Sequence, residues 1–307
     1  MLPTPMTPNA DKESPAFISR SVAQRYLTDP GSIHLGAAKR ISVEAARILA
    51  KHPGALRLGG LTELPEKAAI ALARQRGMLY LKGLRKLPAN VAQALAGHEW
   101  PLFLNGLTVL TVETARTLAR KRGLLHLDGV TDLSHEAAVA LATHRGCLYL
   151  NRLTKIPAET ALILAGHRGT LYLDGISRLS DAAAQALATH RGPLFLSGLT
   201  EISLVAAKSL AARRKRLFID GLGGSLETAR QALSDDEEIL CLDQLTTISA
   251  PVARALAGHW GTLSLNGLTR LSKSAAEALA GHRGPLFLNG LLRPSRGGGG
   301  WLVRTHE

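Results

Sequence analysis

The sequence predicts an α/β solenoid, a fold in which short parallel strands and short helices alternate along the chain. Leu-x-Leu runs, or close variants of them, recur every 23 residues. Each run is followed by a turn and then by a helical pattern of the form A-x-x-L-A. A 23-residue unit is too short for the paired helices of larger repeats, which need at least about 33 residues. One strand and one helix per unit therefore remain.

The strands are predicted by the alternation of apolar residues. The two leucines of each run point to one face of the sheet, and the residue between them points to the other. The twelve runs begin at Ile33, Leu56, Leu79, Leu102, Leu125, Leu148, Leu171, Leu194, Leu217, Leu240, Leu263 and Leu286. No unit can bury its leucines alone, so neighbouring units are expected to stack into one parallel sheet backed by helices.

The helices are predicted by signals at both ends. Polar N-cap residues stand at Ser42, Thr111, Ser134, Ser180, Ser203, Ser249 and Ser272, and Pro65, Pro88 and Pro157 are expected in the first helical turn. Runs such as AGHRG place Gly and basic residues at the helix C-termini. Histidines recur there, and Gln75, Lys121 and Arg213 fill the same position, which favours capping of the last carbonyls over metal binding.

These units resemble the leucine-rich-repeat family, whose pattern is L-x-x-L-x-L-x-x-N/C-x-L. Leu102 and Leu104 match the strand leucines, and Leu107 stands at the Asn/Cys position, with a spacing most like the cysteine-containing variety. The resemblance covers about residues 33 to 292. It implies a right-handed solenoid, shaped as a horseshoe or arc, with the parallel sheet on the concave face and short helices on the convex face. It also implies use as a protein-binding surface.

One departure from the family pattern lies in the turns. An apolar residue fills the Asn/Cys position, so the polar ladder that usually runs through the turns is expected to be absent. The threonines that follow, among them Thr62 and Thr200, are expected to bond backbone groups instead.

The chain is expected to divide into four segments. Residues 1–13 form a disordered N-terminal segment, and residues 14–32 form a helical half-repeat cap, because Ile18–Leu27 aligns with Ile41–Ala50 at an offset of 23. Residues 33–292 hold about eleven full repeats and a final strand, with an irregular ninth unit at Ser225. Residues 293–307 form an irregular Gly-rich tail. An uncovered final strand would allow end-to-end self-association.

Composition and charge limit the compartment and the partners. The balance of 37 Lys+Arg against 24 Asp+Glu gives 37 − 24 = +13, which favours anionic partners or serves solubility. The N-terminus has no signal pattern, and no apolar run reaches the roughly 18 residues of a membrane span, so a cytoplasmic protein without membrane contact is expected. Cys147 and Cys241 lie four repeats apart, too far for a disulfide.

The aromatic residues gather in one column of the predicted sheet. Of nine Tyr and Phe residues, seven stand between the paired leucines. Such rings can stack across strands and stabilise the sheet, and an exposed apolar stripe also marks a partner site. The two uses are compatible. A second outward column is rich in Asn and Asp before Gly, which is ordinary turn chemistry; acids that contact a partner would favour a basic one.

We therefore predict a non-catalytic protein–protein interaction module, such as an adaptor, that binds a protein or peptide on the concave aromatic face. The predicted contact residues are Tyr80, Phe103, His126, Asp128, Tyr149, Asn151, Tyr172, Asp174, Phe195, Phe218 and Asp220. The alternative is binding of a polyanion or nucleic acid along the basic helix-end edge, which is densest at residues 120–122 and 213–216. A purely structural spacer is a third possibility.

No catalytic motif with a defining spacing is present in the sequence. The sequence has no P-loop, G-x-S-x-G, H-E-x-x-H or C-x-x-C motif. His126 and Asp128 beside Tyr149 form an acid–base group, but on a flat sheet without a pocket it is a weak candidate. No catalytic residue, metal or cofactor is expected.

Overall fold

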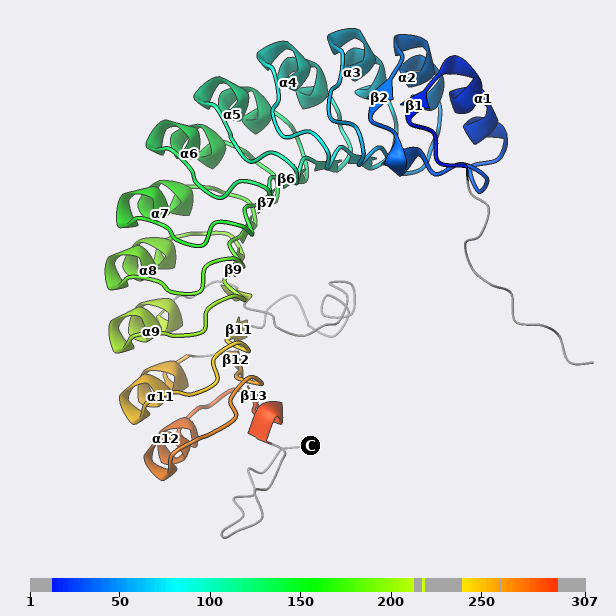
Figure 1. The fold of residues 1–307 in the computed structure, drawn as a ribbon. Coiled ribbons are helices and arrows are strands. Elements are labelled where there is room, and N and C mark those ends of the chain that lie inside the picture. Colours follow the sequence, from blue (N-terminus) through cyan, green and yellow to red (C-terminus); the bar gives the residue numbers. More distant parts are fainter. Residues whose placement is uncertain (1–12, 213–216, 219–238, 260, 292–307) are drawn as a thin grey trace, which may run out of the picture. The chain divides into compact units, whose positions relative to one another are not determined.

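The computed structural model describes residues 13–212, 217–218, 239–259 and 261–291. It divides into two compact units, residues 1–130 with 144–146 and residues 131–143 with 147–307. In each unit short strands and short helices alternate along the chain (Figure 1). The predicted α/β repeat fold is therefore confirmed.

The first unit contains six strands and five helices in its described part. Its strands are β1 (Phe17–Ile18), β2 (Arg40–Ile41), β3 (Leu56–Arg57), β4 (Leu79–Tyr80), β5 (Leu102–Phe103) and β6 (Leu125–His126). Its helices are α1 (Arg20–Thr28), α2 (Val43–Leu49), α3 (Glu66–Leu72), α4 (Ala89–Ala96) and α5 (Val112–Ala119), with a 3-10 turn, η1 (Leu35–Ala37). Strands β3 to β6 pair in parallel in chain order, and β1 pairs with β2. Each helix packs on the next.

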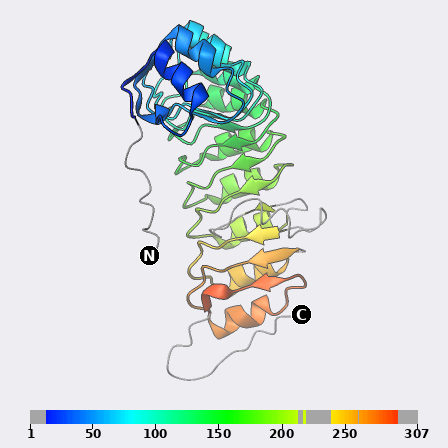
Figure 2. The same cartoon turned by 90° about the vertical axis from the view of Figure 1, so that its right-hand side faces the viewer.

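The second unit repeats this plan. Its strands are β7 (Leu148–Tyr149), β8 (Leu171–Tyr172), β9 (Leu194–Phe195), β10 (Leu217–Phe218), β11 (Ile239–Cys241), β12 (Thr262–Ser264) and β13 (Leu286–Phe287). Its helices are α6 (His135–Ala142), α7 (Ala158–Ala165), α8 (Asp181–Ala188), α9 (Leu204–Ala211), α11 (Ala250–Ala257) and α12 (Lys273–Leu279), with η2 (Asn289–Leu291). Figure 2 shows these strands stacked in chain order.

The register of the strands matches the sequence repeat. In the pairings between strands, the partners stand 23 positions apart, as Leu56 with Leu79 and Arg57 with Tyr80. The leucines of successive units therefore form continuous rows, and Leu56, Leu58 and Leu61 have no exposed surface. Each such leucine contributes about 1.5–3 kcal/mol by its burial.

The helix starts agree with the sequence in most units. The hydroxyls of Ser42, Thr111, Ser134, Ser180, Ser203 and Ser272 accept the expected backbone N–H bonds, whereas Ser249 caps α11 without one. The prediction for the prolines is wrong by one residue. Pro65, Pro88 and Pro157 are themselves the N-cap residues, because their extended backbone places them just outside the helix.

The apolar residues at the Asn/Cys position are buried, among them Leu61, Leu107 and Val130, and a polar ladder that was not expected from the sequence exists in a different column. Asn151 Oδ1 accepts the backbone N–H of Asp174 at 3.0 Å, and Asp174 Oδ1 accepts that of Ser197 at 2.9 Å. Asn266 Oδ1 does the same for Asn289 at 3.0 Å. Each carboxyl or amide group therefore reaches the next repeat.

The threonines bond the backbone as expected. The hydroxyls of Thr62, Thr200 and Thr269 donate to carbonyl oxygens one repeat earlier at 3.5, 3.2 and 3.3 Å. They secure the segment that leads from each strand to its helix.

The two ends of the repeat array are only partly described. The cap holds strand β1 as well as the expected helix, and Glu13 bridges to Ile33. Ser225 of the irregular unit and the Gly-rich tail from residue 293 lie outside the described residues. Within the described part of the chain, no helix is long and apolar enough to cross a membrane.

Candidate functional site

The aromatic column forms stacks of rings on the sheet face opposite the helices. In the first unit the Tyr80 and Phe103 ring centroids lie 4.1 Å apart with planes 10° apart, and Phe103 stacks on His126 at 4.1 Å and 17°. In the second unit Tyr149 stacks on Tyr172 at 3.9 Å and 6°. The expected stacking of the rings across adjacent strands is therefore present.

Stacking leaves different amounts of ring accessible in the two units. Tyr80, Phe103, His126 and Tyr149 remain partly accessible. Tyr172 and Phe195 are each only 7% exposed, so the expectation of an exposed stripe is wrong at these two positions. The same burial raises the pKa of the Tyr172 hydroxyl above its ordinary value. Three neighbouring rings of the first unit, Tyr80, Phe103 and His126, are therefore accessible together.

The polar column beside the rings is engaged within the protein. Asp128 Oδ2 accepts a hydrogen bond from Asn105 Nδ2 at 2.8 Å, and it lies 3.5 Å from His126 Nδ1. In the second unit Asn151 and Asp174 carry the ladder described above. These side chains have a structural role, as expected for Asn or Asp before Gly in a turn.

Sequence reasoning missed a third column on this face. Met78 lies two residues before Tyr80, so the two side chains point to the same side of the strand, and Tyr80 Oη lies 3.5 Å from Met78 Sδ. One and two repeats later this column holds Pro101 and Leu124, both partly accessible. Met78 itself is 41% exposed. The signal in the sequence is the residue two positions before each ring, which is apolar in these three repeats.

Together these residues form an apolar area in the first unit, which we name the sheet-face patch: Met78, Tyr80, Pro101, Phe103 and Leu124. The second unit has Cys147, Thr170 and Pro193 in the third column, which is less apolar. The apolar side chains of the patch therefore do not recur in every repeat.

Arg57 and Lys82 border the patch at its Tyr80 end. The Arg57 guanidinium carbon lies 5.0 Å from the Tyr80 ring centroid, and Lys82 Nζ lies 5.5 Å from it. Both side chains are exposed. Neither is among the predicted contact residues.

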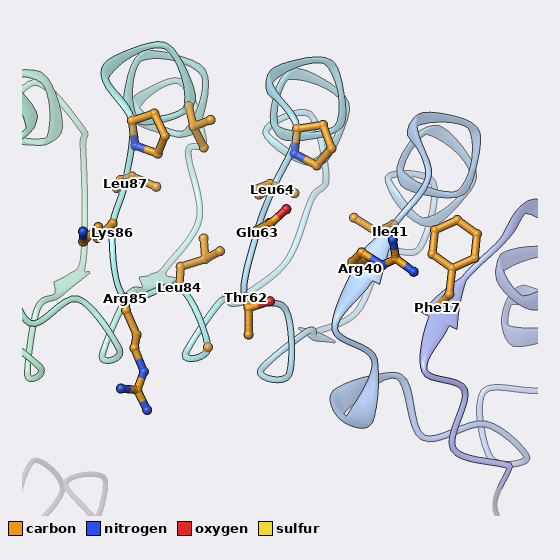
Figure 3. Close-up of a pocket in the computed structure, with 14 residues that line it drawn as sticks. Phe17, Arg40, Ile41, Thr62, Glu63, Leu64, Leu84, Arg85, Lys86 and Leu87 are labelled. Carbon is orange, nitrogen blue, oxygen red and sulfur yellow. The ribbon is translucent and has the colours of Figure 1, made fainter.

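A groove of about 650 Å³ lies on a different surface of the first unit, between the strand ends and the helix starts (Figure 3). Leu64, Leu84 and Leu87 line it together with Arg40, and the Arg85 side chain extends away from Leu84 and Leu87. None of the predicted contact residues lines this groove.

The histidine column caps helices, but those of the preceding repeat. His98 Nδ1 lies 3.3 Å from the carbonyl oxygen of Ala73, the C-cap of α3, and its Nε2 lies 3.1 Å from the Gly77 carbonyl oxygen. His144 makes the same two approaches to Ala119 and Gly123. Desolvation by burial lowers the pKa of His98. The capping interpretation is thus confirmed, with the correction that each ring links two units of the repeat.

The remaining chemical candidates are limited. Among the described residues, no three His, Cys, Asp or Glu side chains gather as a metal site would require. His126 and Asp128 lie together as predicted, and neither of them lines the groove. The side chain of Phe218 and the whole of Asp220 and residues 213–216 lie outside the described residues.

Comparisons with known proteins give similar solved structures only. No family model matches the sequence, and no curated protein matches it. The structure is similar to that of a leucine-rich-repeat protein of Leptospira interrogans, with a TM-score of 0.40, 17% identity, and coverage of 86% of this chain and 80% of that one. It is also similar to an internalin of Listeria monocytogenes, with a TM-score of 0.43, 14% identity, and coverage of 83% and 75%. The 23-residue strand register and the alternation of one strand with one helix show an α/β repeat fold in the chain itself.

Proposed function

We propose that this protein is a non-catalytic binding module that recognises a protein or peptide segment on the sheet-face patch of its first unit. The observation that carries the proposal is the accessible apolar row of Met78 beside the half-buried rings of Tyr80 and Phe103. Apolar and aromatic anchors of this kind supply most of the binding energy in protein interfaces. The flat β-sheet holds them in fixed positions.

The contact residues predicted in the second unit have a smaller part in this proposal. Tyr149 keeps an accessible rim, whereas Tyr172 and Phe195 are nearly covered. Asn151 and Asp174 serve the ladder. Of the predicted contact residues, Tyr80 and Phe103 therefore belong to the sheet-face patch, and His126 and Asp128 lie beside it.

Selection from a displayed library of random peptides tests this proposal. The full chain is expected to enrich peptides with apolar anchors, and Met78→Ser with Phe103→Ser is expected to weaken their binding by at least about tenfold. Met78→Ser alone tests the patch where the double variant unfolds, because Met78 is 41% exposed.

The matched control removes apolar surface elsewhere. Val139→Ser with Leu162→Ser changes residues that are 47% and 60% exposed on α6 and α7, and binding is expected to stay unchanged. An equal loss in both variants would show that the patch has no special role.

A second candidate function, binding of a polyanion along the helix-end edge, is favoured by the exposure of the cations there. Arg74 and Arg76 flank the buried Gln75, and Arg120 and Arg122 flank the buried Lys121. The buried residue secures each loop, so its two neighbours point to solvent. None of these four arginines has an ion pair within the described part of the chain.

Salt dependence tests this second candidate with a fluorescent single-stranded oligonucleotide. Replacing the four arginines by Ser is expected to reduce the slope of log affinity against log salt by about 3, because each phosphate contact contributes about 0.7. Serine replacement of Lys155 and Arg178, which are exposed outside these helix-end loops, serves as control. A slope that is unaltered by the four replacements would rule out this edge.

A further inference from the structure

We infer that the sheet-face patch selects acidic segments, in which an Asp or Glu side chain stands next to an apolar anchor. This inference rests on the proposed binding function. It concerns the chemistry of the partner, and the charged and aromatic groups around Tyr80 carry it.

Two cations at the patch are available to a partner. Arg57 and Lys82 both lie over the Tyr80 ring, at 5.0 and 5.5 Å from its centroid, and both are exposed. Among the described residues, neither lies within 4.0 Å of a carboxylate oxygen. The ring holds the two charges at one place without neutralising them.

The accessible parts of the rings also favour an anion. Tyr80, Phe103 and His126 cover one another's faces, with planes only 10° and 17° apart, so the rims of the rings face outward. The rim of an aromatic ring carries its positive partial charge. A carboxylate placed against the patch therefore meets positive ring edges as well as Arg57 and Lys82.

The acidic residue on this face does not oppose the inference. Asp128 stands beyond the end of β6, two strands from β4, and it is engaged with Asn105 Nδ2 and lies near His126 Nδ1. The earlier expectation that acids on this face favour a basic partner is therefore replaced. The cationic end of the patch is the Tyr80 end.

Other occupants fit the observations less well. A nucleic acid would stack its bases on ring faces, which are covered here by the neighbouring rings. A second copy of the chain carries a formal charge of +13 and would bring more positive charge to Arg57 and Lys82. An acidic peptide segment matches both the charge and the apolar surface.

The same random-peptide selection, read for composition, tests the inference. Peptides enriched on the full chain are expected to carry Asp or Glu beside an apolar residue. Changing that acid to Asn or Gln in a synthetic peptide is expected to weaken binding at least about tenfold to the unmodified protein, and little to the Arg57→Ser, Lys82→Ser variant. Arg85→Ser with Lys86→Ser removes the same charge from exposed positions at the groove, and the acid should keep its full effect there.

The outcomes separate the inference from the proposed function. Enriched peptides that depend on Met78 and Phe103 but show no acidic preference would overturn the inference alone. If no peptide is enriched, both proposals fail. Sedimentation that shows a dimer lost in the Arg57→Ser, Lys82→Ser variant, or oligonucleotide binding lost in it, would overturn the inference in favour of that occupant.

Discussion

Gly60→Ala is expected to lower the free energy of unfolding by about 3 kcal/mol, whereas Gly59→Ala is expected to change it by less than about 0.5 kcal/mol. A Cβ atom at Gly60 would lie 2.4 Å from the carbonyl oxygen of Gly36 and 2.6 Å from that of Ala38. These are backbone atoms of the preceding repeat, and they can move only if two units separate. At Gly59 the nearest atom to a Cβ is the Lys82 Cβ at 3.9 Å.

Urea unfolding of the two variants measures this difference. The two glycines are adjacent in one turn, so the pair separates crowding from the ordinary effect of replacing a turn glycine. Gly106→Ala, where a Cβ would lie 2.0 Å from the Lys82 carbonyl oxygen, should behave like Gly60→Ala. Equal losses at Gly59 and Gly60 would contradict the role given to the close approach of the backbones.

Much of the fold could be predicted because its determinants lie within one repeat unit. The alternation of leucines defines a strand, a Ser or Thr before the helix defines its start, and the 23-residue spacing fixes the register. These features can be recognised in the sequence without knowledge of the side-chain contacts between repeats. The one-residue error at Pro65 is a boundary effect, because proline suits both the N-cap and the first helical turn.

The site was less predictable because it depends on contacts between repeats. Tyr172 is stacked at 3.9 Å on one side by Tyr149 and at 4.1 Å on the other by Phe195 and is 7% exposed, whereas Phe103, also stacked on both sides, keeps more accessible surface. Tyr80 has Phe103 on one side and a flexible Arg57 on the other, so it stays accessible. Residue type alone cannot distinguish these two tyrosines.

Lys121 presents a similar problem in the buried column that links the repeats. It takes the position that His98 and His144 hold in the neighbouring units, and only 1% of it is exposed. Its Nζ donates a hydrogen bond to the Arg122 carbonyl oxygen at 2.6 Å. Desolvation by burial lowers the pKa of Lys121 to about 8. Burial of a charged lysine at this position therefore costs free energy, whereas a neutral histidine can occupy it without that cost.

Lys121→His is expected to raise the free energy of unfolding at pH 7 by about 2 kcal/mol, since a buried ammonium is replaced by a neutral ring. The unfolded chain has an ordinary lysine pKa of about 10.4. Between about pH 8 and pH 10 the unfolded state therefore binds more protons than the folded state, and the stability of the unmodified protein should rise with pH relative to the variant, by about 3 kcal/mol once the lysine is neutral in both states. Below about pH 8 both states are protonated and the full cost of burial remains.

Urea unfolding at pH 7, 8, 9 and 10 checks both the sign and the range of this effect. The difference between the two proteins isolates Lys121 from other groups that titrate at alkaline pH. Lys51→His, at an exposed position of the same helix-end edge, should show no comparable gain. If Lys121→His were less stable than the unmodified protein at every pH, the hydrogen bond to Arg122 would outweigh the burial of the charge. The lysine would then stabilise its own helix-end loop through the Arg122 carbonyl, rather than the preceding repeat as His144 does.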